Sequence, residues 1–140
     1  MNLLKNFTEI KNLIFTINNI YPCANILIIF FLDRFSKLKI VNNFSDQTHY
    51  INNFVNLDLI WNTGIGFGLL SYDSNFAYKL ITILIFLIIL ILFYVAINSK
   101  KIDKLIFSII LGGALGNFYD RLIFNAVPDF IDLHYNNFHW

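Results

Sequence analysis

The sequence predicts an all-α integral membrane helical bundle with a small β-rich segment outside the membrane. Of its 140 residues, 57% are hydrophobic and only 14% are charged, whereas soluble domains carry about 25% charged residues. The chain also contains apolar stretches long enough to match the thickness of a bilayer. A soluble enzyme is therefore disfavoured. The formal net charge of +1 provides no basic surface, so we expect no nucleic-acid partner.

The first predicted helix covers about residues 21–40. Its apolar stretch ends at Leu32, and charged residues crowd its far end. Arg34, Lys37 and Lys39 all belong to that charged end.

A β-rich segment is expected next, over about residues 42–76. Apolar and polar residues alternate weakly there, and glycines follow the alternation. Short strands and a glycine-containing turn account for both features.

The clearest element is a transmembrane helix over residues 78–98. The stretch from Leu80 to Ile97 is apolar apart from Thr82 and the hydroxyl of Tyr94. At about 1.5 Å per residue this stretch spans about 27 Å, close to the hydrocarbon thickness of a bilayer. A strand of this length is not expected, because strands rarely exceed about eight residues.

A third helix is predicted over about residues 104–120. It is uncharged only from Leu105 to Tyr119. That stretch makes a helix of roughly 22 Å, which is too short to cross the hydrocarbon core of a bilayer unless the flanking charged residues enter it. We therefore expect Asp120 and Arg121 to lie at or just inside one membrane interface, at the mouth of the bundle.

Lysine placement predicts the orientation of the bundle. Lys100, Lys101 and Lys104 cluster in the short connection between the second and third helices, and the positive-inside rule places such a cluster in the cytoplasm. The β-rich segment is then extracytoplasmic. The cations at the end of the first helix oppose this orientation, but Asp33 and Lys37 are spaced to pair on one helix face and leave less free charge.

Three carboxylates in or beside the predicted helices need an explanation. Asp33, Asp120 and Asp129 would each cost a few kcal/mol in hydrocarbon. They could simply lie at interfaces, where the cost is small. Alternatively, they could converge at one depth on the outer side, where water and a peptide both reach them.

The C-terminal residues could form a metal site on residue type alone. Asp129, Asp132, His134 and His139 all carry suitable ligand atoms. The i, i+4 spacing of paired zinc histidines on a helix is absent, and no third ligand stands out. We therefore expect no metal.

A glycine-rich stretch in the third helix has a simpler interpretation. Gly112 and Gly116 have the small-xxx-small spacing that lets two membrane helices approach closely. Helix packing is its expected role.

Four motifs, taken in order, resemble the lipoprotein signal peptidases (signal peptidase II) along nearly the whole chain. They are Asp33-Arg-Phe-Ser-Lys37, Asn62-Thr-Gly-Ile-Gly-Phe67, Gly112-Gly-Ala-Leu-Gly-Asn-Phe-Tyr-Asp-Arg121 and Val127-Pro-Asp-Phe-Ile-Asp132. The resemblance implies a four-helix membrane aspartyl peptidase. Such an enzyme removes the signal peptide from diacylglyceryl-modified prolipoproteins, cutting before the lipidated cysteine, and uses no metal or organic cofactor.

The same resemblance implies the site residues. Asp129 matches the first member of the family's catalytic aspartate pair. The positions that match polar residues lining or bracing the site are Asn62, Asn117, Asp120, Arg121, Asp33 and Lys37. The expected partners are lipid-modified prolipoproteins and membrane lipids.

The second catalytic aspartate of the family has no match here. It lies in a Phe-Asn-x-Ala-Asp motif that opens the fourth helix, after the position of Trp140. By this resemblance residues 1–140 are a single peptidase domain that is C-terminally incomplete, with three of four helices. Two close carboxylates share a proton, so that one acts as base and the other as acid. Substitution by Asp132, on a shared helical face with Asp129, or by Asp120 is disfavoured.

Two alternatives remain beside this reading. The chain could be a small non-catalytic membrane protein whose polar residues only pack helices, or an inactive truncated relic that binds lipid-modified peptides without cutting them. The first is disfavoured, because helix packing does not require four separated polar motifs at one outer depth. The expected location is the bacterial plasma (inner) membrane, multi-pass, with the active site on the extracytoplasmic side.

Overall fold

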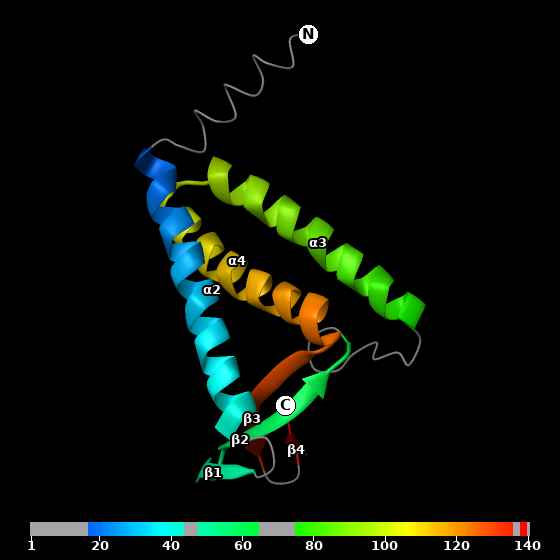
Figure 1. Ribbon diagram of the computed structural model, residues 1–140. Coiled ribbons are helices and arrows are strands. Elements are labelled where there is room, and N and C mark those ends of the chain that lie inside the picture. The colour runs from blue at the N-terminus through cyan, green and yellow to red at the C-terminus, as the bar shows by residue number, and fades with distance from the viewer. Residues whose placement is uncertain (1–16, 44–47, 65–74, 136–137, 140) are drawn as a thin grey trace.

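A computed structural model describes residues 17–43, 48–64, 75–135 and 138–139. Within these ranges, three long helices form a bundle, and a four-stranded antiparallel sheet lies at one end of it (Figure 1). The elements are α2 (Ile17–Asn43), β1 (His49–Asn52), β2 (Val55–Asn62), α3 (Asn75–Asn98), α4 (Lys101–Phe124), β3 (Val127–Tyr135) and β4 (Phe138–His139).

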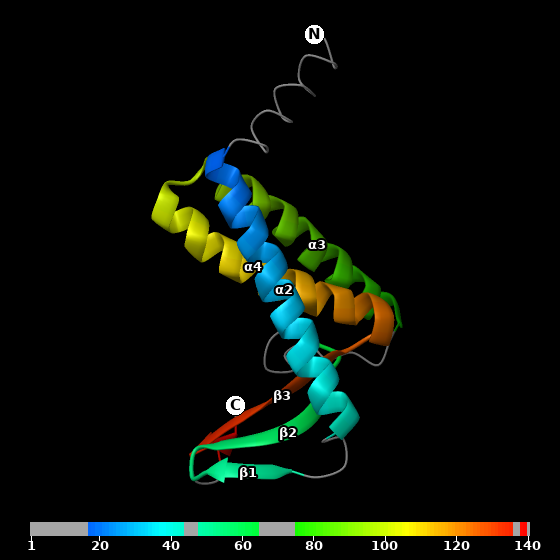
Figure 2. The same cartoon turned by 60° about the vertical axis from the view of Figure 1, so that its left-hand side comes forward.

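The helix α4 packs against both α2 and α3 (Figure 2). Their shared core contains Ile26, Ile89, Ala96 and Leu111. Most other large apolar side chains of the bundle are exposed. This exposure would be unfavourable in water, but lipid tails are as apolar as these side chains.

Two of the helices that the structure describes are long and apolar enough to cross a membrane, α3 over Tyr78–Asn98 and α4 over Lys101–Phe124. Asparagines near the beginning of α2 and charges in its second half dilute its apolar stretch. Among the described helices α2 therefore does not meet the same test of composition. The predicted helices over about 21–40, 78–98 and 104–120 are all present, and each extends a few residues further than expected.

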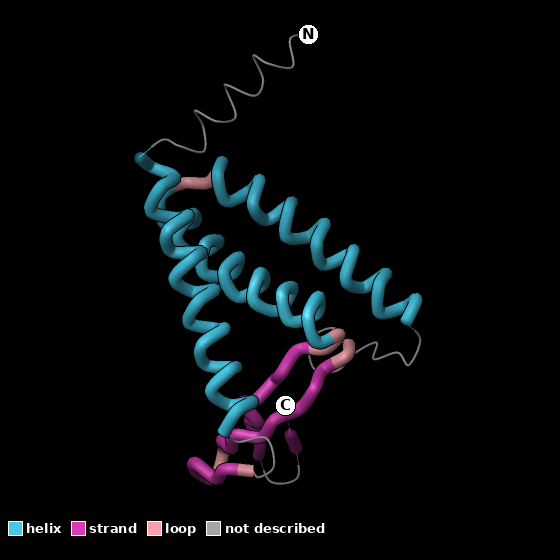
Figure 3. The backbone as a smooth tube through the Cα atoms, in the orientation of Figure 1, coloured by secondary structure: helices cyan, strands magenta, loops and turns pink. Residues whose placement is uncertain are grey.

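The strand order of the sheet is β1-β2-β3-β4, and its strands (magenta in Figure 3) lie together at one end of the helices. Its first two strands lie inside the expected segment 42–76, part of which falls outside the described residues. The pairing of β2 with β3 aligns Asn62 with Val127 and Asn56 with Asp132. A residue of the segment 42–76 is thus paired with one near the C-terminus, which brings distant parts of the sequence together.

The strand β3 was not expected from the sequence. The helix α4 ends at Asn125, whose left-handed backbone (φ 54°, ψ 22°) is a common helix termination. The chain then pairs with β2 from Val127 onward. The expectation that Asp129 and Asp132 share a helical face is therefore wrong. On a strand, residues three apart point to opposite faces.

Candidate active site

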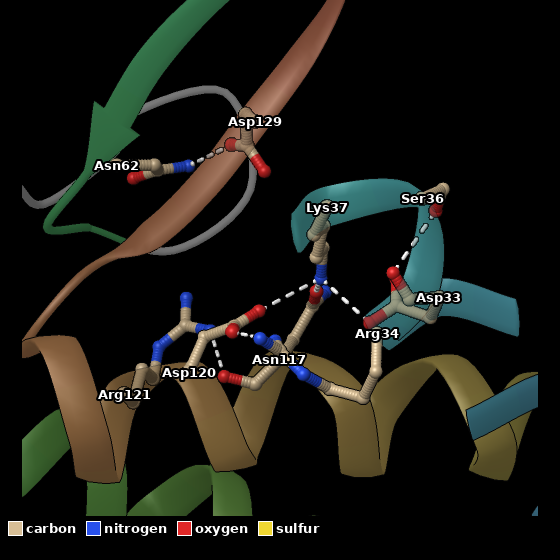
Figure 4. Close-up of polar contacts among 9 residues, drawn as sticks. All are labelled: Asp33, Arg34, Ser36, Lys37, Asn62, Asn117, Asp120, Arg121 and Asp129. Atoms are coloured by element: carbon tan, nitrogen blue, oxygen red, sulfur yellow. Dashed lines mark hydrogen bonds and ion pairs between the residues drawn. The ribbon is translucent and has the colours of Figure 1, made fainter. Parts of the chain in front are cut away.

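The predicted site residues gather where α2 and α4 meet the sheet (Figure 4). They form two groups. One is an ionic cluster between α2 and α4, and the other is a pair of side chains on β2 and β3. Arg121 lies between the two groups.

The ionic cluster is centred on Asp120, whose side chain is 0% exposed. One of its carboxylate oxygens accepts a hydrogen bond from Arg34, and the other lies 2.9 Å from Nζ of Lys37. A buried carboxylate without such partners would cost several kcal/mol. These two cations therefore make the buried position of Asp120 tolerable and join α2 to α4.

Lys37 has two further partners in this cluster. Its Nζ atom lies 2.9 Å from Oδ2 of Asp33, one turn earlier on α2, and donates to Oδ1 of Asn117 at 2.6 Å. With the bond to Asp120, three side-chain oxygens therefore surround this ammonium within 2.9 Å. The predicted pairing of Asp33 with Lys37 is thereby confirmed.

Gly116 gives Asp33 the room it occupies. A Cβ atom at Gly116 would collide with the Asp33 carboxylate. A larger residue at Gly116 would therefore require the Asp33 side chain, which crosses α4 at this point, to move.

The second group joins Asn62 on β2 to Asp129 on β3. Nδ2 of Asn62 donates to Oδ2 of Asp129 at 2.8 Å, and Oδ1 of Asn62 accepts from the backbone N–H of Gly64 at 2.8 Å. The two bonds fix the amide of Asn62 with its donor toward Asp129. Asn62 is buried whereas Asp129 is exposed, so the carboxylate is both oriented and accessible.

Arg121 connects the helix bundle to the β2 end. Its guanidinium donates to the carbonyl of Gly64 at 2.8 Å and to the carbonyl of Asn117 at 3.2 Å. In Figure 4 it points from α4 toward the strands that carry Asn62 and Asp129. Arg121 thereby holds the turn that also orients Asn62.

The structure brings all seven predicted site residues to this end of the bundle, where Asp120 and Asp129 belong to two separate groups that Arg121 links through Asn117 and Gly64. Asp120 is bonded to Arg34 and Lys37, whereas Asp129 is bonded to Asn62. Sequence reasoning did not include Arg34 in the site. A signal for it existed, because a carboxylate deep in a membrane helix requires cationic partners, and Arg34 lies one turn before Lys37.

A third polar group lies further along β3, where Asp132, His134 and His139 come together. Burial raises the pKa of Asp132, but hydrogen bonds from His139 and Asn56 and the neighbouring imidazoles lower it more, so the pKa lies below its ordinary value. Asp132 is therefore a carboxylate at neutral pH. The sequence disfavours a metal at these residues, because the helical spacing of paired zinc histidines is absent and no third ligand stands out.

Comparison with known proteins identifies the family. The sequence profile described as signal peptidase (SPase) II matches residues 25–140. The chain belongs to the signal peptidase II family. It is therefore a peptidase by family, and the resemblance of its four motifs is confirmed.

Several curated relatives within the signal peptidase II family are similar to the chain. A lipoprotein signal peptidase of Pelagibacter ubique (strain HTCC1062) is 49% identical over 118 residues, which cover 82% of this chain and 71% of the relative. One from Solibacter usitatus (strain Ellin6076) is 37% identical, covering 81% and 73%. One from Anaplasma phagocytophilum (strain HZ) is 43% identical, covering 78% and 70%.

Solved structures agree on the fold of this signal peptidase II chain. Two structures described as bacterial membrane enzymes superpose with TM-scores of 0.67 and 0.63, at 26% and 28% identity. They cover 84% and 81% of this chain, and 73% and 74% of their own lengths are covered. With its two apolar helices, the chain is a membrane protein.

Proposed function

We propose that this protein removes signal peptides from diacylglyceryl-modified prolipoproteins, with Asp129 as one of two catalytic aspartates. The observation that carries the proposal is the hydrogen bond between Asn62 and Asp129. It holds an accessible carboxylate in a fixed orientation directly beside the apolar bundle. A substrate anchored by its acyl chains would present its peptide bond at this level.

In the proposed hydrolysis, a carboxylate activates a water molecule that attacks the peptide bond. An ionised Asp129 takes a proton from water as the water attacks the scissile carbonyl. A second, protonated carboxylate donates to the carbonyl oxygen, as in aspartic peptidases where two close carboxylates share one proton. Asp120 is unsuited to that part, because both its oxygens already accept from cations. By resemblance, the second aspartate belongs to the Phe-Asn-x-Ala-Asp motif that follows the position of Trp140 in the family.

The remaining residues of the site hold the geometry. Lys37, Asp33, Asn117 and Asp120 lock α2 to α4, and Arg121 fixes the turn after β2. Displacing a catalytic group by about 1 Å costs ~100-fold in rate. Bracing of this kind is therefore part of catalysis even where a side chain does not touch the substrate.

The same proposal includes the arrangement in the membrane. Residues 1–140 belong to one membrane peptidase domain in which α2, α3 and α4 all cross the bilayer of the bacterial plasma membrane. The sheet and the site face the extracytoplasmic side. Support comes from the clustering of lysines at the α3–α4 connection, at the opposite end of the bundle from the sheet (Figure 1).

The test is cleavage of a lipid-modified precursor in a bacterial host depleted of its own lipoprotein signal peptidase. The protein is expressed from its own gene, and precursor and mature forms are separated by gel electrophoresis. We expect Asp129→Asn to lower cleavage by about 100-fold or more, because the amide cannot take up a proton. Asp58→Asn, which changes a carboxylate on the neighbouring strand β2, is the matched control and should cleave normally.

Membrane insertion is measured in parallel for both variants. Normal cleavage by Asp129→Asn would overturn the role of Asp129. Absence of cleavage by the unmodified protein would overturn the proposed activity.

A further inference from the structure

The sheet carries a second polar cluster, made of Asp132 and His134 on β3 and His139 on β4. Residues two apart on a strand share a face, so Asp132 and His134 point to the same side. His134 is paired directly with His139 across the two strands, which places the second imidazole on that side as well. Three residues with metal-ligating atoms are therefore brought together by strand register alone.

The distances within this cluster are short. Nδ1 of His139 lies 2.9 and 3.1 Å from the two carboxylate oxygens of Asp132, and Nδ1 of His134 lies 3.4 Å from Oδ2. One ligand atom from each residue lies within 4.8 Å of the others. Ligands of a tetrahedral zinc ion bound at about 2.0 Å are separated by about 3.3 Å. The observed separations of each imidazole from the carboxylate bracket that value.

Two buried polar atoms at the cluster lack hydrogen-bond partners. They are Nδ1 of His134 and Oδ1 of Asn56, considered against the residues that the structure describes. Asn56 is paired with Asp132 across the sheet and donates to it at 3.3 Å. A buried donor or acceptor without a partner costs about 1–3 kcal/mol. A cation held between the imidazoles and the carboxylate would use the lone pair of His134.

We propose that Asp132, His134 and His139 bind a divalent transition-metal ion of the zinc class. Two imidazole nitrogens and one carboxylate are a donor set typical of zinc, with a fourth position left for water or an amide oxygen. The side chains of Asp132 and His134 are 10% and 13% exposed, whereas that of His139 is 59% exposed. Asp132 and His134 are thus mostly buried, and an ion could enter from solvent on the side of the exposed His139.

The ion would hold the short strand β4 against β3. With only two residues, β4 contributes few ladder hydrogen bonds, so a metal bridge between His134 and His139 would strengthen this edge. Asp129 is an odd number of residues from both Asp132 and His134, and strand alternation places it on the opposite face. The metal site is therefore separate from the proposed peptidase site and does not rest on it.

The experiment uses the full 140-residue chain in detergent, purified through a histidine-free tag and treated with a chelator. It is titrated with Co²⁺, whose visible absorption reports tetrahedral coordination, and Zn²⁺ is then added as competitor. We expect one ion per chain and displacement by Zn²⁺. We expect Co²⁺ binding to be about 10- to 100-fold weaker in each of the variants His134→Ala, His139→Ala and Asp132→Asn. Losing a residue that only orients a metal ligand already weakens binding by this much, so losing a ligand should weaken it at least as much.

His49→Ala is the matched control, because His49 lies in the same sheet but outside the cluster. It should bind Co²⁺ as the unmodified chain does. His139 is exposed, so His139→Ala decides the question even if substitution of the more buried His134 impairs folding. Binding that is unchanged by His139→Ala, equally weakened by His49→Ala, or absent from the unmodified chain would overturn the proposal.

Discussion

At the scale of single residues, Asp120 shows how a charge is accommodated in the bundle. Its carboxylate is fully buried and is bonded to Arg34 and Lys37, while Lys37 is also paired with Asp33. Two cations and two carboxylates leave the cluster without net charge. Replacing a buried ion pair by apolar groups is often tolerated, but removing one partner leaves an uncompensated charge.

Asp120→Asn is therefore expected to destabilise the bundle by about 3–5 kcal/mol, because Arg34 loses its ionic partner. The measurement is the free energy of unfolding in mixed micelles titrated with a denaturing detergent. Asp103→Asn, on an exposed position of the same helix, is the control and should cost less than about 1 kcal/mol. Equal losses in the two variants would show that the buried cluster is not held by charge.

Asn62 supplies a second prediction at this scale. Asn62→Ala removes both the donor to Asp129 and the acceptor for the N–H of Gly64. We expect processing of a lipid-modified precursor to fall by roughly 10- to 100-fold, because the catalytic carboxylate loses its fixed orientation. Insertion into the membrane should be unchanged, and Asn53→Ala in the exposed turn after β1 should process normally. Unimpaired processing by Asn62→Ala would remove Asn62 from the site.

At the scale of elements, glycines set how closely α2 approaches α4. A Cβ atom at Gly112 would lie 2.5 Å from Cβ of Ile29 and 2.9 Å from the backbone oxygen of Ile26. At Gly113, on the same helix, a Cβ atom would meet nothing within 4 Å. The neighbouring glycines therefore differ in whether a partner helix covers them.

Gly112→Ala is expected to lower the unfolding free energy by about 1–3 kcal/mol, since α2 has to move away from α4. Gly113→Ala is expected to leave stability unchanged or to raise it by up to about 1 kcal/mol, because alanine favours the helix. Unfolding of both variants in mixed micelles tests this. If the two substitutions have the same effect, the close approach at Gly112 is not what holds the helices together.

The helices and strands differ in how well the sequence alone predicts them. Apolar length predicted α3 and α4, and motif resemblance placed Asn62 and Asp129 in one site. The strand β3 was missed, because residues 127–135 pair with β2 across a separation of more than sixty positions. A metal site among the C-terminal residues is disfavoured by the sequence for a different reason, because Asp132, His134 and His139 lack helical ligand spacing and are brought together by strand register.

At the scale of the whole molecule, the ionic cluster reduces a conflict in the charge distribution. Arg34 and Lys37 lie at the sheet end of α2, where they oppose the proposed orientation. Their charges are matched by Asp120 and Asp33, so they contribute little free positive charge there. The lysines around the α3–α4 connection, at the other end of the bundle (Figure 1), then dominate the bias that directs insertion.

This balance predicts that the sheet faces outward and the α3–α4 connection faces the cytoplasm. In a Cys23→Ser background, single cysteines are introduced by Asn53→Cys in the β1–β2 turn and by Lys101→Cys at the beginning of α4, both exposed positions. A membrane-impermeant maleimide applied to intact spheroplasts should label the first and should label the second only after permeabilisation. Lys101→Cys removes one positive charge but leaves Lys100 and Lys104 in place, so most of the orienting bias is retained. Labelling in the reverse pattern would place the site on the cytoplasmic side, where an extracytoplasmic precursor could not reach Asp129.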